Sequence, residues 1–584
     1  MIEIDGSQFN DFKQFLKQDG VEYYVTSQPE DSYYLIYTNT NQEFKLPANL
    51  YKSITSNNYD PIIFGNDSTE NVVNIDIKDD GQVILYKEVN GVLMSEIQEF
   101  RPWILTNRAI TEDSQKLEGY QYYKWITEFE SVDAWQKAKN QLRKKHHSDG
   151  FMYVANDLKE NFMMRHGITY FKNMKPREIS ILSFDIESNG LVMNEDSKTF
   201  LISNTYRCGD KVVKKLFDIF DYNCNDQDMI DAWCEWVSQL DPSFILGHNI
   251  VSYDLKWLNH CSRDGLKIGR DGSNLDFASY SSQFRKDGSQ SYEYNKAILN
   301  GREVIDTFFL SIKYDLGRKY ESYGLKQIIK QEGLEKEGRS FVDASKIKEV
   351  YYRIIASNYK DREALTEWTK VCEYAKDDSE DALKLFDLMS PALFYSTQSV
   401  PKSFQNMVET ATGSQINSLL VRSYLQYNKS IPKAYETDYV EGGISFAIPG
   451  IYRNLIKVDL KSCYPSQVLR FKLYDKQKDP EGLFYYMVKY FTEKRFEYKK
   501  LGKETGDVYY KDLDAAAKVF INSAYGLCQT GGLNFNAPEI AAKITYESRK
   551  LIDMALVWGS GKGVDYWKRL FLEKTGKETQ DEES

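Results

Sequence analysis

A predicted strand that ends in two carboxylates constrains the fold of this chain most. Residues 179–184 read Ile-Ser-Ile-Leu-Ser-Phe, a pattern typical of a buried strand, and Asp185 and Glu187 follow it two positions apart. Because side chains alternate across a pleated strand, both carboxylates lie on one face, where they can hold a divalent cation. Strand and helix patterns then alternate to about residue 395. The sequence therefore predicts an α/β sheet with helices packed on it.

Two further acidic positions follow this strand. A second strand candidate, residues 244–246, is followed by Tyr253 and Asp254. Tyr374 and Asp378 stand four apart on a helix expected over about residues 363–388, so both project from one face. The chain contains 86 Asp and Glu residues, so any one of these acids alone is more typical of a turn or a solvated helix. Their joint order and spacing instead favour convergence at one edge of the sheet.

Carboxylates gathered in this way have a definite chemistry. Two cations about 3.5–4 Å apart can activate a water, stabilise a departing oxygen and offset the charge of a phosphodiester. The phenol of Tyr374 would help to orient the attacking water. Asp306, at the end of a strand expected over residues 303–305, is a further acid for which structural support is the favoured role. The predicted reaction is phosphodiester hydrolysis.

A second set of polar residues follows in the last third of the chain. An apolar strand expected over residues 455–458 leads into Asp459, a carboxylate placed where a cation could meet a triphosphate. Lys518, Asn522 and Tyr525 stand at i, i+4 and i+7, so they share one face of a helix. This face can meet a nucleotide.

Five runs, in this order along the chain, resemble the motifs of B-family DNA polymerases. Residues 184–187, 249–254 and 374–378 are similar to the three proofreading-exonuclease motifs. Residues 459–466 are similar to polymerase motif A, and residues 518–526 to polymerase motif B. The resemblance implies an RNase H-like 3′-to-5′ exonuclease domain in which Tyr374 orients the water. The implied metal ligands are Asp185, Glu187, Asp254 and Asp378. The implied cofactor is Mg²⁺ at two-metal sites, with Mn²⁺ as an alternative.

The resemblance to motif A implies two roles in the polymerase half. Asp459 would be a metal ligand. Tyr464 would lie under the incoming sugar, where its ring would clash with a 2′-hydroxyl and exclude ribonucleotides. Cys463 stands where the family usually has Leu. Because the cysteine side chain is smaller, the difference should alter packing and fidelity more than metal binding. The implied substrates are primer-template DNA and deoxynucleoside triphosphates.

The resemblance also implies a cationic grip on the triphosphate. Arg495 and Lys499 are one helical turn apart, and with Lys518 they would converge on the polyanion. Tyr525 would pack near the nascent base pair, with Asn522 on the same face. For Lys499 alone, a solvated lysine-rich helix is the simpler interpretation.

One family motif has no counterpart in the sequence. Family members carry an Asp-Thr-Asp strand after the fingers, and residues 526–584 contain no such run, only Asp553, Asp565 and Asp581. Without that second carboxylate, nucleotidyl transfer would lose several kcal/mol of charge stabilisation. We expect the N-terminal part of a split or truncated polymerase, whose third motif and thumb come from a second polypeptide. The alternatives are a stand-alone 3′-to-5′ DNA exonuclease and an inactive DNA-binding or assembly remnant.

The predicted fold class is a multidomain α/β protein, and its parts differ in composition. The first two parts are an acidic, mostly-β N-terminal domain (residues 1–174) and an RNase H-like exonuclease domain (175–395). The others are a partial palm (396–475), helical fingers (476–535) and a palm segment with a charged tail (536–584). Strands are expected at residues 33–37 and 82–86, and helices at 132–145, 485–503 and 511–526.

Charge and composition limit the remaining function classes. The formal net charge is −11, and residues 1–100 hold 17 Asp and Glu against 6 Lys and Arg. Contacts to DNA must therefore come from local basic groups, because the overall charge repels phosphate. Seven cysteines without a Cys-x-x-Cys pair argue against a zinc ribbon or disulfide scaffold. The start lacks a signal-peptide pattern and no long apolar run occurs, so we expect a soluble, cytoplasmic protein without a membrane partner.

Overall fold

The computed structural model describes residues 59–146, 150–285, 291–339, 342–436, 441–453, 457, 459–460 and 462–577, and outside them only short strands. The chain divides into two compact units, Met1–Pro61 and Ile62–Ser584. The first unit contains a sheet of order β1-β4-β3-β2. Its strands are β1 (Ile2–Glu3), β2 (Tyr23–Gln28), β3 (Ser32–Tyr37) and β4 (Gln42–Pro47). The strand expected at residues 33–37 is confirmed by β3.

The second unit opens with two small sheets and two helices. The first sheet has the order β5-β6-β7 and the second β11-β8-β10-β9. Their strands are β5 (Val72–Ile77), β6 (Gln82–Val89), β7 (Val92–Glu99), β8 (Trp103–Thr106), β9 (Gln115–Lys116), β10 (Trp125–Glu128) and β11 (Met152–Tyr153). The helices are α4 (Val132–Lys145) and α5 (Leu158–His166), and a single turn, α3 (Pro61–Phe64), precedes β5. The mostly-β start of the chain and the helix at 132–145 are therefore confirmed.

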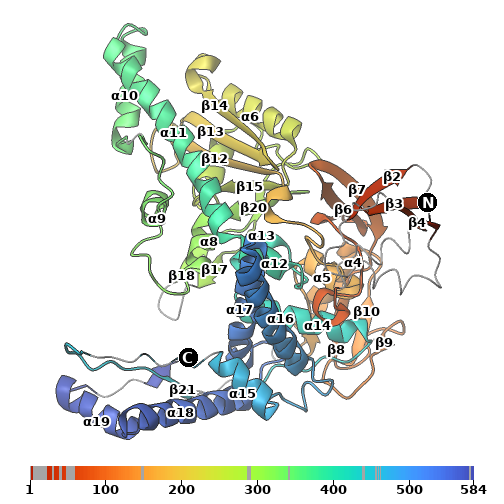
Figure 1. Ribbon diagram of the computed structural model, residues 1–584. Coiled ribbons are helices and arrows are strands. Elements are labelled where there is room, and N and C mark those ends of the chain that lie inside the picture. The colour runs from red at the N-terminus through yellow and green to blue at the C-terminus, as the bar shows by residue number, and fades with distance from the viewer. Residues whose placement is uncertain are drawn as a thin grey trace. The chain divides into compact units, whose positions relative to one another are not determined.

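A five-stranded sheet forms the centre of the second unit, in the order β14-β13-β12-β15-β20 (Figure 1). Its strands are β12 (Ile181–Ser188), β13 (Thr199–Cys208), β14 (Lys211–Asp218), β15 (Phe244–Gly247) and β20 (Glu303–Asp306). β12 to β14 are antiparallel neighbours, whereas β15 is parallel to β12 and to β20. This is the expected RNase H-like arrangement of strands, and it places the carboxyl ends of β12, β15 and β20 at the same edge.

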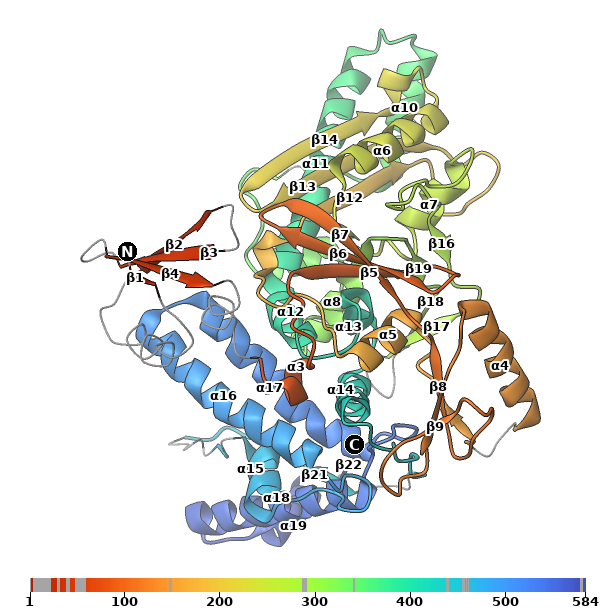
Figure 2. The ribbon, with the colours of Figure 1, turned by 90° about the vertical axis from the view of Figure 1, so that its right-hand side faces the viewer.

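Helices cover this sheet. α11 packs across β12 and β13, and α6 packs against β13 and β14. The helices in this part of the chain are α6 (Asp226–Leu240), α7 (Asp254–Cys261), α8 (Thr307–Tyr314), α9 (Leu325–Gln331), α10 (Ala344–Ala356) and α11 (Arg362–Met389). Between α7 and α8 lie two strand pairs, β16 with β19 and β17 with β18: β16 (Asp276–Phe277), β17 (Ser282–Arg285), β18 (Ser291–Tyr294) and β19 (Ala297–Ile298). Figure 2 shows these pairs between α7 and α5 in that view.

The last third of the chain is mainly helical. Its elements are α12 (Pro391–Thr397), α13 (Phe404–Glu409), α14 (Thr412–Gln426), β21 (Glu441–Ile444), α15 (Cys463–Phe471), α16 (Leu483–Thr505), α17 (Val508–Gln529), α18 (Pro538–Ser560), α19 (Val564–Thr575) and β22 (Asp581–Glu583). α16 and α17 confirm the two long helices, and they pack along one another with Phe491 and Phe520 stacked at 4.5 Å (Figure 1). The strand expected at 455–458 lies largely outside the described residues. The division into five domains stays a prediction.

An aromatic cluster holds the central sheet to the segments before and after it. Phe171 stacks on Phe394 of α12 with ring centroids 4.4 Å apart, and Phe244 of β15 stacks on Phe404 of α13 at 5.3 Å. All four rings are fully buried. Large buried aromatic side chains dominate core energetics, so this cluster fixes α12 and α13 against the sheet. None of the described helices combines the length and apolarity that crossing a bilayer requires.

Candidate functional site

Three carboxylates meet where α11 crosses β12. One oxygen atom each from Asp185, Glu187 and Asp378 lie within 4.8 Å of one another. Asp185 and Glu187 share a face of β12 because of the strand pleat, and Asp378 reaches them from the helix that covers this face. We call these three residues the carboxylate centre. In the part of the chain that the structure describes, it is the only group of at least three His, Cys, Asp or Glu side chains with this spacing.

Asp254 lies beside the carboxylate centre but outside its compact group. It is the first residue of α7, it is 5% exposed, and its Oδ1 accepts a hydrogen bond of 3.3 Å from the backbone N–H of Ile186. This bond ties Asp254 to the residue between Asp185 and Glu187. Three of the four predicted metal ligands thus converge closely, and the fourth stands next to them.

The electrostatics of these acids favour a bound cation. Burial, with the charges of Asp254, Asp378 and Glu187, raises the pKa of Asp185 well above its ordinary value. Burial and the nearby Asp378 raise the pKa of Glu187 to about 8, and burial raises the pKa of Asp254 to about 7. Crowded carboxylates resist ionisation because each charge is desolvated and repelled by the others. A divalent cation coordinated by oxygen would remove this penalty, so the side chains fit Mg²⁺ or Mn²⁺.

Tyr374 lies beside the carboxylate centre, as its position one turn before Asp378 requires. The phenol is 4% exposed, and its hydroxyl contacts the Nζ of Lys326. The same Nζ lies 4.1 Å from the centroid of the Tyr374 ring and 3.7 Å from Oδ2 of Asp378. Lys326, from α9, therefore brings a cation to both groups. The sequence analysis missed it, because nothing in the sequence distinguishes Lys326 from Lys330, the other lysine of this short helix.

Arg339 is a second cation that the sequence analysis missed. Its guanidinium pairs with the carboxylates of Asp378 and Asp381, and its side chain is 2% exposed. Asp381 follows Asp378 by three residues on α11, a spacing that places both on one face and that could have indicated a shared partner. Burial raises the pKa of Asp378 to about 6, although Lys326 and Arg339 oppose the shift. A cation at the carboxylate centre would compete with Arg339 for Asp378.

Asp306 lies at the end of β20 and organises the loop that leads to Asp254. Its carboxylate accepts hydrogen bonds from the backbone N–H groups of Asn249 (2.7 Å), Val251 (3.1 Å) and Phe308 (2.9 Å). These contacts cap α8 and hold the turn between β15 and α7. This placement favours the structural role.

Replacing Asp306 by Asn is expected to lower the free energy of unfolding by about 2 kcal/mol, since an amide has one acceptor oxygen for three backbone N–H donors. The loosened loop should also weaken metal binding at the neighbouring carboxylates. Urea unfolding and a Mg²⁺ titration measure the two effects. The matched control is Asp221→Asn at an exposed position, and equal stability of the two variants would contradict this role of Asp306.

The predicted polymerase residues lie around α15, α16 and α17. Tyr464 and Tyr525 have ring centroids 4.9 Å apart. Arg495 bonds Asp514 and the hydroxyl of Ser462, each at 3.0 Å. Lys499, Lys518 and Asn522 are exposed on α16 and α17, and Asp459 is exposed and joins no group of three acids among the described residues. The structure thus places the two tyrosines together and leaves Lys499 and Lys518 accessible, whereas Arg495 is engaged by Asp514 and Ser462.

Comparison with known proteins bears on the segment that holds this site. The family model described as DNA polymerase family B, exonuclease domain, matches residues 155–328. This segment is similar to the exonuclease domain of family B DNA polymerases. The match includes β12, with Asp185 and Glu187, and the start of α7, with Asp254. Tyr374 and Asp378 lie after it on α11.

Curated relatives extend the similarity beyond this segment. The chain is 22% identical over 394 residues to DNA polymerase II of Escherichia coli (strain K12), covering 59% of this chain and 44% of that protein. It is 21% identical over 422 residues to a DNA polymerase of Thermococcus sp. (strain 9oN-7), covering 65% of this chain and 51% of that one. The chain thus spans about half the length of these relatives.

A solved structure supports the fold. The family B DNA polymerase of Pyrobaculum calidifontis superposes with a TM-score of 0.65 over 87% of this chain and 76% of that chain, at 15% sequence identity. Likeness at this identity concerns the fold, and it agrees with the predicted multidomain α/β architecture.

Proposed function

We propose that this chain is part of a family B DNA-directed DNA polymerase and that its carboxylate centre performs 3′-to-5′ exonucleolytic hydrolysis of DNA. The observation that carries the proposal is the approach of three carboxylates within 4.8 Å, two of which, Asp185 and Glu187, lie in the segment that matches the family's exonuclease model. The two relatives reported above are named DNA polymerases, which supports the polymerase part of the proposal.

Each residue near the carboxylate centre has a role in the proposed hydrolysis. Asp185, Glu187 and Asp378 would hold the divalent cations, with Asp254 completing the ligand set. Bound cations supply water activation and charge stabilisation for phosphodiester cleavage. The Tyr374 hydroxyl orients the attacking water, since it projects from α11 one turn before Asp378. The Nζ of Lys326, next to that hydroxyl, offsets negative charge on the scissile phosphate.

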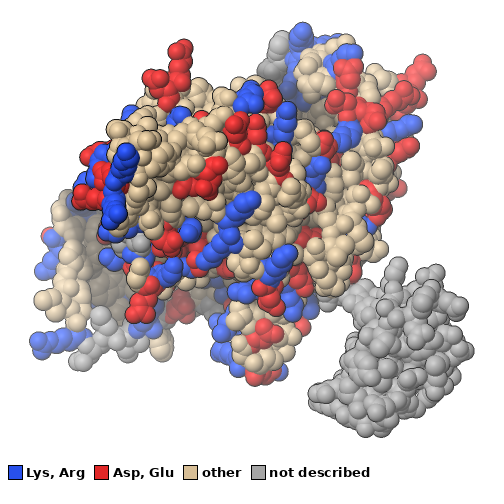
Figure 3. Space-filling view, turned by 90° about the horizontal axis from the view of Figure 1, so that it is seen from above, with Lys and Arg blue, Asp and Glu red and all other residues tan. Residues whose placement is uncertain are grey.

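The proposal for synthesis rests on the helical part of the chain. Asp459 would bind a metal, Tyr464 would contact the sugar, and Tyr525 would pack near the nascent base pair. The triphosphate contacts would be Arg495, Lys499 and Lys518, with Asn522 on the same face. On the face that Figure 3 shows, positive and negative side chains are interspersed, so binding of DNA to that face would depend on local groups. An Asp-Thr-Asp carboxylate and a thumb would come from a second polypeptide.

A primer-template labelled at the primer 3′ end tests the proposal. With Mg²⁺ and deoxynucleoside triphosphates, the chain alone should release mononucleotides without extending the primer, and a chelator should stop the release. Adding a polypeptide that carries an Asp-Thr-Asp segment and a thumb should produce extension. Binding without release would instead support a DNA-binding remnant, and release that no partner converts to extension would support a stand-alone exonuclease. Extension by the chain alone would refute the dependence on a partner.

A further inference from the structure

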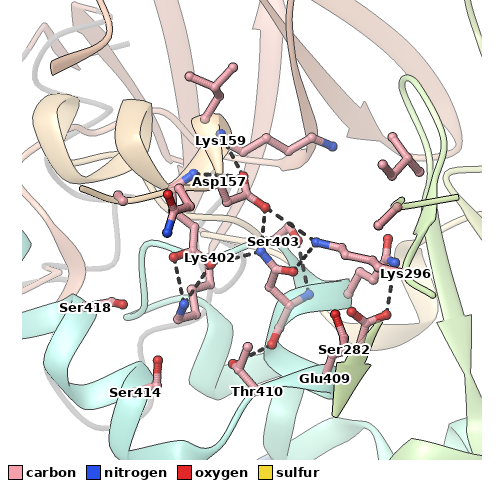
Figure 4. Close-up of a pocket in the computed structure, with 18 of the residues that line it drawn as sticks. Asp157, Lys159, Ser282, Lys296, Lys402, Ser403, Glu409, Thr410, Ser414 and Ser418 are labelled. Atoms are coloured by element: carbon pink, nitrogen blue, oxygen red, sulfur yellow. Dashed lines mark hydrogen bonds and ion pairs between the residues drawn. The ribbon is translucent and has the colours of Figure 1, made fainter. Parts of the chain in front are cut away.

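A cavity of about 910 Å³ lies apart from the carboxylate centre. Its wall is formed by residues at α5, the strands β16 to β19, α13, α14 and residues 532–534 (Figure 4). The lining includes none of the three acids of the carboxylate centre, nor Asp254 or Tyr374. Sites for small ligands span about 300–1,000 Å³, so the volume suits a ligand as large as a nucleotide.

On one side of the cavity, the charged side chains form hydrogen bonds and ion pairs with one another. Lys402 donates to both carboxylate oxygens of Glu160 at 2.7 Å each. The Nδ2 of Asn406 donates to Asp157 at 2.8 Å and to Glu160 at 2.9 Å, and its Oδ1 accepts from Lys296. Figure 4 shows Asp157, Lys296 and Lys402 joined by these contacts. This side is therefore a rigid wall whose charges already satisfy one another.

The balance of charge limits the chemistry of a ligand. Four lysines line the cavity, and five carboxylates line it as well. A cavity without a surplus of positive charge does not favour a polyphosphate. It suits a ligand that is mostly neutral, rich in hydrogen-bonding groups and at most locally anionic.

Several polar groups on the other walls are unengaged or only loosely held. Ser418 is 4% exposed, and within the described residues neither its hydroxyl nor that of Ser414, one turn earlier on α14, has a hydrogen-bond partner. Figure 4 shows both on the helix across the cavity. The Nζ of Lys159 has its nearest acceptor, Oδ1 of Asn74, at 3.4 Å, and its nearest carboxylates at 3.9 and 4.0 Å. Two hydroxyls and one weakly paired cation thus face a space large enough for a ligand.

An aromatic surface completes the lining. The ring of Tyr280 is 68% exposed although it borders the cavity, and Phe277 of β16 lies close to it in sequence. Exposed aromatic rings bind nucleobases by stacking, worth about 1–3 kcal/mol for each base.

We propose that this cavity binds one unpaired nucleotide. The heterocycle stacks at Tyr280, the hydroxyls of Ser414 and Ser418 contact its polar edge or sugar, and Lys159 pairs with its single phosphate. The nucleotide is either free or part of a DNA single strand, because both present the same base, sugar and phosphate. The proposal goes beyond the exonuclease reaction and does not depend on it, since the cavity shares no lining residue with the carboxylate centre.

The test measures binding of 2-aminopurine to the full chain in the presence of a chelator, so that no cleavage occurs. The probes are free 2-aminopurine deoxyriboside 5′-monophosphate and a short single-stranded oligodeoxynucleotide that contains one 2-aminopurine. The fluorescence change on binding should be lost, or the Kd raised about tenfold, in Lys159→Met and in Ser414→Leu. Lys159→Met removes a charge-assisted contact, and Ser414→Leu fills the space with a larger side chain. Binding of both probes identifies a free nucleotide as a ligand, and binding of the strand alone identifies a base carried by DNA.

The matched control is Lys137→Met, which removes an exposed lysine of α4 outside the cavity and should bind both probes as the unmodified chain does. Circular dichroism and Mg²⁺-dependent release of the 3′-terminal nucleotide check that the cavity variants are folded. Retained release with lost 2-aminopurine binding supports the proposal. Failure of the unmodified chain to bind either probe, or equal binding by all variants, overturns it whether or not the exonuclease is active.

Discussion

Replacing Asp185 by Asn should reduce exonuclease activity about a thousandfold or more while making the metal-free protein more stable. The loss follows because one ligand of a charge-stabilising cation site disappears, a change worth several kcal/mol in the transition state. The gain follows because Asp185 is a half-buried carboxylate whose pKa is raised by desolvation and by three neighbouring acids. Removing its charge should raise the free energy of unfolding by about 1–2 kcal/mol at pH 8.

The raised pKa values also predict how the free energy of unfolding of the metal-free protein changes with pH. The pKa of Glu187 rises from 4.5 to about 8 on folding, so the folded state holds more protons than the unfolded state between these values. The free energy of unfolding of the metal-free protein should therefore fall as pH increases from about 5 to 8. Asp185→Asn should flatten this slope, because it removes a second carboxyl group whose pKa is raised on folding.

Thermal unfolding with and without Mg²⁺ measures the stability effects, and release from a labelled 3′ end measures activity. The unmodified protein should be stabilised by Mg²⁺ and Asp185→Asn much less so. The exposed control Asp221→Asn should match the unmodified protein in all three measurements. A fall in stability of metal-free Asp185→Asn would contradict the repulsion on which the metal-site assignment depends.

Local pattern was enough to predict the elements that carry the acids. β12, β15, β20 and α11 were predictable because each is a buried run or a helical period bounded by polar residues. Asp185 and Glu187 lie on one face because side chains alternate along a strand, which the sequence alone indicates. The proximity of Asp378 depends on α11 crossing β12, which an alternation of strands and helices indicates only in outline.

The cations of the site could not be predicted in this way. Lys326 and Arg339 reach Asp378 from positions 52 and 39 residues earlier in the chain, and each belongs to a segment with several similar side chains. Their role depends on how α9 and the following loop fold over α11. The periodicity of the sequence does not indicate such a long-range contact. The cavity beside α14 is a similar case, because its wall joins residues from five separate stretches of the chain.

Replacing Lys402 by Met should lower the free energy of unfolding by about 3–5 kcal/mol, the cost of leaving one member of a buried ion pair without its partner. Lys402 and Glu160 have side chains that are 5% and 11% exposed, and the amine donates to both carboxylate oxygens. The pair joins α5 to the segment before α13 across 242 residues of sequence. Its loss therefore acts on the packing between two segments rather than on one helix.

A buried and an exposed ion pair can be compared within the same chain. Lys137→Met breaks the pair with Asp133 on α4, where both side chains are about 70% exposed, and should change stability by no more than about 0.5 kcal/mol. The double change Lys402→Met with Glu160→Gln should recover more than half of the loss, because the carboxylate left without a partner is the source of the cost. Urea unfolding of the four proteins measures these differences. Equal effects of Lys402→Met and Lys137→Met would show that the junction between α5 and α13 does not depend on this ion pair.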